Sequence, residues 1–458
     1  MKFKLNYILI PLLLVVGYFL LLYSMPKYTG QYLFMVILIL ADFYLWSSVK
    51  KQVFNYKNWL RVLTITIYWL PLLLLVILLV GSVIIPVIHW NDSIRTYMVG
   101  VILVFYTAKI LPITFLILAD VVRVIQKIFI IVKKDNRQQI IEKNAALATS
   151  VTDEGVQEGI SRNKFLQYIG FISGGLVLGT MFTGMLKWVY EFKIIQEKIV
   201  FPHLPRNFNG FKIVQISDLH LGSWTSKKPL QRAVNMINEL HPDIILFTGD
   251  LVNYATNEAL EFEDILSQLK AKDGVYAILG NHDYGNYVTW PSAEAKRENM
   301  KQLINFFDKI GWKLLNNENE ILSKESGKLA IIGVENWGAN MRFPKYGDID
   351  KAIQGSEQAD IKILMTHDPS HWEKVVIPGN YDIDLALSGH THGFQFGIET
   401  KDLKWSPAKY MYKHWAGLYQ DRKKSGKYIY VNRGLGSIGY PGRIGILPEI
   451  TVIELMSS

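Results

Sequence analysis

The sequence predicts an α-helical membrane anchor followed by an α/β domain, and two features of its residue pattern predict this division. Long apolar runs fill the 458-residue chain up to about residue 190. After residue 201, short β-branched or apolar runs alternate with helix-like amphipathic stretches. We therefore expect a transmembrane region over residues 1–190 and a second domain over residues 191–458.

The first region contains five apolar runs, and each is long enough to cross a bilayer as a helix. They cover residues 7–23, 28–46, 62–88, 97–119 and 165–186. A cleaved signal peptide alone would not repeat in this way. A polar stretch over residues 120–164 separates the last two runs and is expected to be a loop with some helix. Asp42 and Lys109 fall within or near spans, where they mark either a span boundary or a helix-helix contact.

The basic residues between the runs predict the orientation of the anchor. Lys and Arg are concentrated in the loop over residues 50–61 and in the loop that begins at Arg123. Basic loops stay on the cytoplasmic side, so five spans place the N-terminus inside and the second domain on the outer face. The same bias explains the formal charge of +9 without nucleic acid, so no nucleic-acid partner is expected. The expected partner of the first region is the lipid bilayer.

The second domain is predicted from six buried strands and two amphipathic helices. The strands cover residues 211–217, 244–248, 275–279, 329–334, 361–366 and 383–388, and the helices cover residues 229–240 and 258–269. Sheets of this class place ligand sites just beyond the carboxyl ends of their strands. The residues at those ends are therefore the first candidates for a functional site.

Five of these strands are followed by residues that can bind a metal ion. The residues are Asp218, His220, Asp250, Asn281, His282, Asp283, His367, Asp368, His390 and His392. The chain contains no cysteine, so a metal site here must use His, Asp, Glu or Asn. Each motif alone is more often a surface ion pair or a turn, but the ordered set predicts one metal-binding edge.

The spacing of the ligands suggests how they converge. An Asp-x-His on an extended loop would point both side chains the same way, because alternate residues of an extended chain share a face. His390 and His392 repeat this spacing, and Gly389 and Gly393 beside them allow a tight backbone.

The region 211–449 resembles the calcineurin-like metallophosphoesterase superfamily, and within it the bacterial membrane-associated branch. The superfamily pattern is Asp-x-His, Gly-Asp, Gly-Asn-His-Asp/Glu, His and Gly-His-x-His, and every element is matched here. The resemblance implies two facing β-sheets flanked by helices and a pair of divalent ions such as Mn, Fe or Zn. It implies that Asp218, His220 and His392 hold one ion and that Asn281, His367 and His390 hold the other. Asp250 would bridge the two ions.

The resemblance also implies a hydrolytic mechanism. A metal-bound hydroxide would attack phosphorus, His282 would protonate the leaving oxygen, and Asp283 would orient the His282 ring or raise its pKa. A structural role for His282 is the alternative. Arg443 would either bind a substrate phosphate or cap the domain. His371 lies outside the motifs, although it is close to His367 in sequence.

The sequence therefore predicts a metal-dependent phosphoesterase in the bacterial cytoplasmic membrane, with its catalytic domain on the periplasmic or extracellular face. A tethered domain suggests a lipid-linked phosphate, as a monoester or a diester. One alternative is an anchored phosphodiesterase for soluble nucleotides. Another is a membrane sensor or scaffold that binds without cleaving, although such a protein would be expected to lose ligands and here none is missing.

Overall fold

The computed structural model describes residues 6–24, 26–86, 89–143, 162–400, 402–421 and 426–458. The chain forms two compact units. The first comprises Met1–Val87 and Val101–Thr180, and the second comprises Ile88–Gly100 and Met181–Ser458. The second unit thus includes two short segments that the predicted boundary at residue 190 assigned to the anchor.

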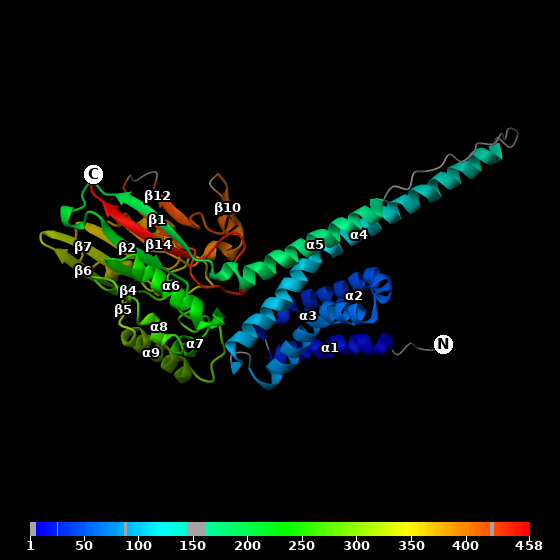
Figure 1. Cartoon of the computed structure of the whole chain (residues 1–458), viewed down its shortest axis with the longest axis horizontal. Helices are drawn as coiled ribbons and strands as arrows, with labels where there is room; N and C mark the ends of the chain where they lie inside the picture. The colour runs from blue at the N-terminus through cyan, green and yellow to red at the C-terminus, as the bar shows by residue number, and fades with distance from the viewer. Residues whose placement is uncertain (1–5, 25, 87–88, 144–161, 401, 422–425) are drawn as a thin grey trace. The chain divides into compact units, whose positions relative to one another are not determined.

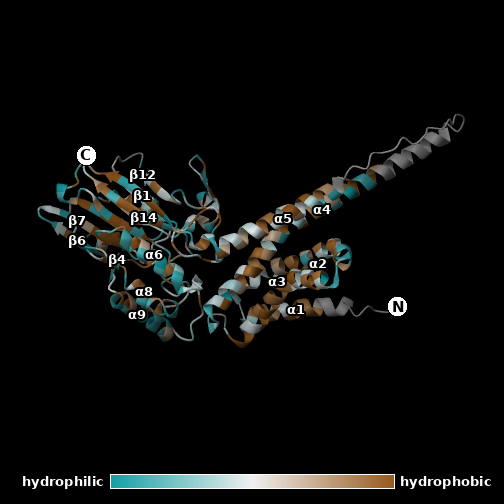
Figure 2. Cartoon of the chain, viewed as in Figure 1, coloured by the Kyte–Doolittle hydropathy of each residue, from teal (hydrophilic) through white to brown (hydrophobic). Residues whose placement is uncertain are grey.

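The first unit is built from apolar helices. They are α1 (Asn6–Ser24), α2 (Tyr32–Phe54), α3 (Asn58–Ile84) and the larger parts of α4 (Asp92–Lys143) and α5 (Arg162–Leu186). Figure 2 colours the described parts of α1, α2 and α3 as mainly hydrophobic, and many of their large apolar side chains are exposed. A helix that is apolar on all sides requires an apolar surrounding.

Among the described residues, four helical stretches are long and apolar enough to cross a membrane. They are Tyr32–Phe54, Asn58–Ile84, Asp92–Phe129 and Lys164–Tyr190. The first predicted run corresponds to α1, whose stretch Leu12–Ser24 is apolar but shorter. The count of five spans therefore stays a prediction. Helix α4 continues to Lys143, so the start of the predicted polar loop is helical, and residues 144–161 lie outside the described residues.

The two charged residues within the predicted spans form a helix-helix contact, which was one of the two expected roles. Lys109 Nζ on α4 lies 2.6 Å from Asp42 Oδ1 on α2. The same ammonium group donates a hydrogen bond of 3.2 Å to the carbonyl oxygen of Tyr68 on α3. Both charged side chains are buried. The pair therefore connects three helices where neither charge would be tolerated alone.

The second unit contains two six-stranded sheets (Figure 1). The first sheet has the order β1 (Lys193–Val200), β14 (Glu449–Met456), β2 (Phe211–Ile216), β3 (Ile244–Phe247), β4 (Val275–Ala277) and β5 (Lys313–Leu314). The second has the order β12 (Gly417–Gln420), β13 (Tyr428–Val431), β9 (Leu385–Ser388), β8 (Ile361–Met365), β7 (Gly327–Gly333) and β6 (Glu318–Lys324). All six predicted strands are present.

Three buried clusters hold this unit together. Side chains from the inner faces of both sheets, such as Ile213, Leu246, Ile331 and Leu387, form one cluster between the sheets. A second cluster joins the first sheet to α6 (Lys227–Glu239), α8 (Glu263–Leu266) and α9 (Ala293–Lys309), which Figure 1 shows along one side of that sheet. A third covers the outer face of the second sheet. The expected pair of facing sheets flanked by helices is confirmed.

One predicted helix is divided. The stretch 258–269 forms two short helices, α7 (Asn257–Leu260) and α8, because Phe262 leaves the helical backbone at φ −103° and ψ 3°. The Phe262 ring is fully buried in the cluster beneath the first sheet, so packing outweighs the local helical preference.

The direction of the strands positions the functional site. Strands β2, β3 and β4 run parallel, as do β7, β8, β9 and β13. The carboxyl ends within each parallel set lie at one edge of its sheet. The loops after β2, β3, β4, β8 and β9 carry the predicted ligands.

Candidate metal centre

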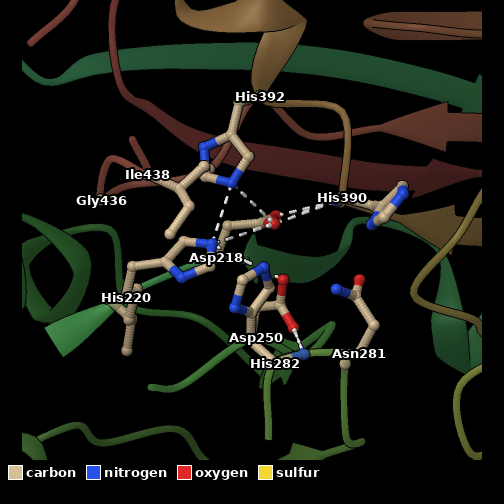
Figure 3. Close-up of polar contacts among 12 residues, drawn as sticks. Asp218, His220, Asp250, Asn281, His282, His390, His392, Gly436 and Ile438 are labelled. Atoms are coloured by element: carbon tan, nitrogen blue, oxygen red, sulfur yellow. Dashed lines mark hydrogen bonds and ion pairs between the residues drawn. The ribbon is translucent and has the colours of Figure 1, made fainter. Parts of the chain in front are cut away.

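Two groups of potential ligands face each other at this edge (Figure 3). The first contains Asp218, His220 and His392, which come from the loops after β2 and β9. His392 Nε2 lies 3.2 Å from Asp218 Oδ1 and 3.0 Å from His220 Nε2. The site therefore joins the two sheets.

The second group contains Asp250, His367 and His390. His367 Nε2 lies 3.2 Å from Asp250 Oδ2, 3.2 Å from His390 Nδ1 and 3.2 Å from Asn281 Oδ1. Asn281 thus brings an amide oxygen to the same point.

Asp250 lies between the two groups. Its Oδ2 atom is 3.5 Å from His220 Nε2 in the first group and 3.2 Å from His367 Nε2 in the second. Its other oxygen accepts a hydrogen bond of 2.8 Å from the backbone N–H of His282, which fixes the carboxylate. The structure thus brings all seven predicted ligands together, with Asp250 at the position expected of a bridge.

The backbone reaches this arrangement in a different way from the one expected. The Asp-x-His loops are not extended, because Asp218, His220, His390 and His392 all have φ between 45° and 69°. Asp250 has φ 60°. Left-handed backbone is unfavourable for residues with a Cβ and occurs mainly at functional sites. The predicted convergence is present, but the predicted mechanism of convergence is wrong.

Gly389 has the close approach that the sequence suggested. A Cβ atom at this position would lie 1.9 Å from Ser217 Oγ and 2.3 Å from Asp218 Oδ2. No side chain fits there, so glycine allows the loop after β9 to reach the loop after β2.

The donor atoms fit divalent cations. His220 and His392 point ring nitrogens at each other 3.0 Å apart, and carboxylate oxygens surround them. Burial lowers the pKa of His220 and of His390, which favours the neutral imidazole that a metal ion requires. Burial also opposes charging of His367, but Asp250 outweighs it and raises the pKa of His367 to about 10. The carboxylates thus attract positive charge to a buried site made of ligand atoms.

His282 is held by its backbone and by a neighbouring loop. Its Nδ1 atom lies 2.8 Å from the carbonyl oxygen of Asn253, and since a carbonyl only accepts, Nδ1 carries the proton. Nε2 is then the nitrogen available to a reacting group. Asp283, which was expected to orient this ring or raise its pKa, has other hydrogen-bond partners in the structure. The Asp283 carboxylate instead accepts hydrogen bonds from the backbone N–H groups of Asp250, Leu251, Val252 and Gly280.

The surroundings of Asp283 shift the pKa of its carboxyl group. Burial and the nearby Asp250 raise the pKa of Asp283 to about 7, while its backbone hydrogen bonds oppose the shift. Its role in the structure is to shape the loop that carries Asp250.

The Asn253 loop is anchored by a residue at the start of α4. Asn253 N–H donates a hydrogen bond of 2.6 Å to Glu258 Oε2, and Arg95 Nη2 lies 3.5 Å from Glu258 Oε1. Burial raises the pKa of Glu258 to about 7. Both side chains belong to the second unit. Arg95, Glu258 and Asn253 lie outside every sequence motif, so their contacts could not be predicted from the sequence.

Arg443 caps the domain, which is the second of its two expected roles. It is fully buried, and its guanidinium group donates hydrogen bonds to the carbonyl oxygens of Arg433 at 2.8 Å and Gly434 at 3.1 Å. It also lies 3.4 Å from Nδ1 of His392. These contacts support a metal ligand from behind and leave the guanidinium without exposed surface for a substrate.

Three further residues near the centre differ in role. His371 belongs to neither ligand group, because its Nδ1 atom lies 3.0 Å from Thr366 Oγ1 and its ring contacts Trp337.

Tyr412 Oη lies 2.8 Å from Nε2 of His390, and Tyr287 Oη accepts a hydrogen bond of 2.8 Å from Asn281 Nδ2. The tyrosines therefore orient ligands, and no motif spacing indicates them.

A cavity of about 190 Å³ opens at the centre. His220, His282, His390 and His392 line one part of it, and Phe343, Phe394, Met411, Tyr412 and Ile438 are among its other lining residues. A larger cavity of about 1120 Å³, lined by Trp372 and His414 among others, contains none of the predicted ligands. The smaller cavity is the one relevant to chemistry at the metal centre.

Known families and proteins match both regions of the chain. The family described as calcineurin-like phosphoesterase matches residues 211–394, and the transmembrane domain of probable calcineurin-like phosphoesterases matches residues 30–188. The metallophosphoesterase YkuE of Bacillus subtilis is 30% identical over 65% of this chain and 99% of its own length. The chain belongs to the calcineurin-like metallophosphoesterase family.

The chain is also similar to two further proteins, one of which is named as a transmembrane protein. The transmembrane protein with metallophosphoesterase domain of Danio rerio is 30% identical, and the match covers 65% of each chain. The UDP-2,3-diacylglucosamine pyrophosphatase LpxG of Chlamydia trachomatis is 28% identical over 51% of this chain and 81% of its own length. The predicted family is confirmed, and the protein is an integral membrane metallophosphoesterase.

Proposed function

We propose that the protein hydrolyses a phosphate ester carried by a lipid, using two divalent metal ions. The observation that carries this proposal is the convergence of six other ligand side chains from both sheets around the carboxylate of Asp250. The ester is a phosphomonoester or a phosphodiester.

In this proposal Asp218, His220 and His392 would hold one ion, Asn281, His367 and His390 would hold the other, and Asp250 would serve both. Mn, Fe or Zn bound there would lower the pKa of a coordinated water and neutralise charge on the phosphate. His282 acts from its doubly protonated form: Nδ1 keeps its proton on the Asn253 carbonyl, and the second proton passes from Nε2 to the leaving oxygen. Asp283 holds the Asp250 loop in place through its backbone hydrogen bonds.

Three observations support a lipid-borne substrate. The cavity of about 190 Å³ is smaller than the roughly 300–1,000 Å³ of sites that enclose a whole small molecule, so it fits a phosphate group while the rest of the substrate lies outside. The second unit continues directly into two apolar helices. The LpxG relative is named for a diacylated substrate.

We also propose that the catalytic unit lies on the outer face of a bacterial cytoplasmic membrane. Helix α5 leads from the basic stretch that contains Arg123, Lys127, Lys133, Lys134, Arg137 and Lys143 to the catalytic unit. One crossing therefore separates the unit from a basic, cytoplasmic loop, whatever the number of earlier spans. A reporter fused after Ser458 that is active only in the cytoplasm would contradict this orientation.

The function is tested with the purified full-length chain in lipid nanodiscs and defined metals. The substrates are a long-chain lipid phosphate, a cyclic nucleotide and a chromogenic diester. We expect hydrolysis of the lipid phosphate, and we expect chelation or Asp250→Asn to lower the rate by about a hundredfold or more. The matched control is Asp308→Asn on α9, an exposed carboxylate remote from the motifs.

Each alternative has its own outcome in this assay. Preference for the cyclic nucleotide would indicate an anchored phosphodiesterase for soluble nucleotides. Metal binding without hydrolysis of any ester would indicate a sensor or scaffold. Hydrolysis that survives both chelation and Asp250→Asn would contradict the metal mechanism.

A further inference from the structure

A patch of exposed apolar side chains borders the mouth of the cavity. We call it the apolar rim, and it consists of Phe394, Phe396, Ile398, Leu403, Tyr410 and Met411. Tyr410 is 74% exposed and Met411 is 66% exposed. Phe394 and Met411 also line the cavity itself. Large exposed apolar side chains gathered in one stretch of the chain beside a cavity are typical of an interaction surface.

The rim is held by a structured framework. Its segments are the turn η7 (His392–Gln395), the hairpin of β10 (Ile398–Glu399) and β11 (Lys404–Trp405), and the turn η8 (Pro407–Tyr410). Ser406 Oγ donates a hydrogen bond of 2.7 Å to the carbonyl oxygen of Gly393, and Ala408 is buried with Trp415 and Ile446 beneath the turn. The apolar side chains therefore stand exposed on a fixed support.

The framework connects directly to the end of a membrane helix. Gln395 Nε2 donates hydrogen bonds to the carbonyl oxygens of Tyr440 at 2.7 Å and Gly442 at 3.0 Å. The hydroxyl of Tyr440 in turn donates to the carbonyl oxygen of Met181 on α5. The backbone N–H of Arg443 donates to the carbonyl oxygen of Gly184 at 3.2 Å. All of these residues belong to the second unit.

Gly184 shows how close this contact is. A Cβ at Gly184 would lie 2.6 Å from Tyr440 Oη and 2.7 Å from the Arg443 carbonyl oxygen. The rim is thus separated from the last turns of the α5 span by one loop.

Basic residues accompany the apolar ones. Lys409 and Lys413 are exposed on either side of Tyr410 and Met411, and Lys409 Nζ lies 5.1 Å from the centre of the Tyr410 ring. Aromatic and basic side chains beside apolar ones are typical of surfaces at the level of lipid headgroups.

We propose that the apolar rim inserts into the membrane interface and places the cavity mouth at headgroup level. A lipid-borne phosphate then reaches the metal centre without its acyl chains entering water. The partner that covers the apolar rim is the bilayer surface. This proposal rests on the lipid-directed function proposed above.

The first test measures contact with lipid and does not depend on activity. Because the chain has no cysteine, Tyr410→Cys can carry a single environment-sensitive fluorophore in the full-length protein in nanodiscs. The matched control is Ser326→Cys, in the exposed turn between β6 and β7. Lipid-borne quenchers should quench the label at residue 410 several-fold more strongly than the label at residue 326. Equal quenching at both positions would overturn the proposal, as would shielding of residue 410 only when another protein is added.

The second test separates access of lipid from chemistry. Leu403→Ser combined with Tyr410→Ser removes two rim side chains that do not line the cavity. We expect kcat/KM to fall about tenfold for a long-chain phosphate ester in the nanodisc and to stay unchanged for a soluble chromogenic ester. Equal losses for both substrates, or no loss for either, would overturn the proposal. If the wild-type protein hydrolyses no ester, the proposed function fails while the quenching result still decides whether the rim contacts lipid.

Discussion

The side chains of the metal centre depend on strained backbone and on the bonds that hold it. Asp218, His220, Asp250, His390 and His392 each have positive φ, a conformation that costs of order 1–3 kcal/mol per residue at such sites. The four backbone hydrogen bonds accepted by Asp283 are one source of compensation. The buried carboxylate of Asp283 therefore stabilises the geometry of the ligand loops, while His282 is the residue proposed to donate a proton.

The buried His371 should make the second unit sensitive to acid. Burial lowers the pKa of His371 to about 4, against about 6.5 in an unfolded chain. As the pH falls, His371 is therefore protonated in the unfolded state before it is protonated in the folded state. The stabilisation of the folded state that is present above pH 6.5 is lost between pH 6.5 and 4. The full difference is about 3 kcal/mol.

His371→Gln removes this titration while keeping a polar group near Thr366. In denaturant titrations of the full-length chain in detergent, we expect the variant to lose less free energy of unfolding than wild type between pH 6.5 and 4. Identical losses in both proteins would show that the buried imidazole does not control this transition.

At the scale of elements, the first turns of α4 are part of the catalytic unit. Arg95 forms an ion pair with Glu258, and Glu258 accepts a hydrogen bond from the backbone N–H of Asn253. The carbonyl oxygen of Asn253 accepts a hydrogen bond from Nδ1 of His282. Arg95 is therefore a positioning residue for the proposed proton donor.

Arg95→Gln should affect substrates according to their leaving group. An alkyl phosphate ester needs a proton on its leaving oxygen and a nitrophenyl ester does not, so we expect the rate for the alkyl ester to fall about tenfold more. Arg95→Lys keeps the charge near Glu258 and should restore part of the difference. Equal losses for the two esters would indicate a general loss of structure.

The ion pair between α2 and α4 should be essential as a pair. Lys109→Met leaves Asp42 buried and uncompensated, and we expect a loss of roughly 3–5 kcal/mol in stability. Combining it with Asp42→Asn should recover most of the loss, which thermal unfolding in detergent would measure. A double variant as unstable as Lys109→Met alone would argue against this explanation.

The elements that could be predicted are those whose local pattern agrees with their final environment. Strands β2, β3 and β8 are short, β-branched and buried, and polar ligand motifs follow them. Strand β1 mixes charged and apolar residues without regular alternation, and β5 has only two residues, so their assignment depends on partners distant in sequence.

The same distinction applies to the site. The metal ligands lie in motifs of fixed order and could be predicted. Asn253 acts through a backbone carbonyl, and Tyr412 acts from a loop without regular spacing. Neither residue type indicates its role, because only the tertiary fold brings each one to a histidine of the centre.

At the scale of the whole molecule, the boundary between anchor and catalytic unit is not a point in the sequence. The catalytic unit takes Ile88–Gly100 from one side of the α4–α5 hairpin and everything from Met181 on the other side. The pattern of apolar runs could not reveal this, since hydropathy marks spans and does not show which unit packs against their ends.

Strand β14 has a consequence for biosynthesis. It lies between β1 and β2, with Lys193 opposite Glu449 and Gln215 opposite Thr451. Until the ribosome has released residues 449–456, strand β14 is missing from the sheet. Strand β1 then has no partner, and one edge of β2 is open. Such a gap requires late, long-range pairing, which is slow and exposes strand edges to aggregation. We therefore expect the catalytic unit to depend on chaperones until this strand is inserted.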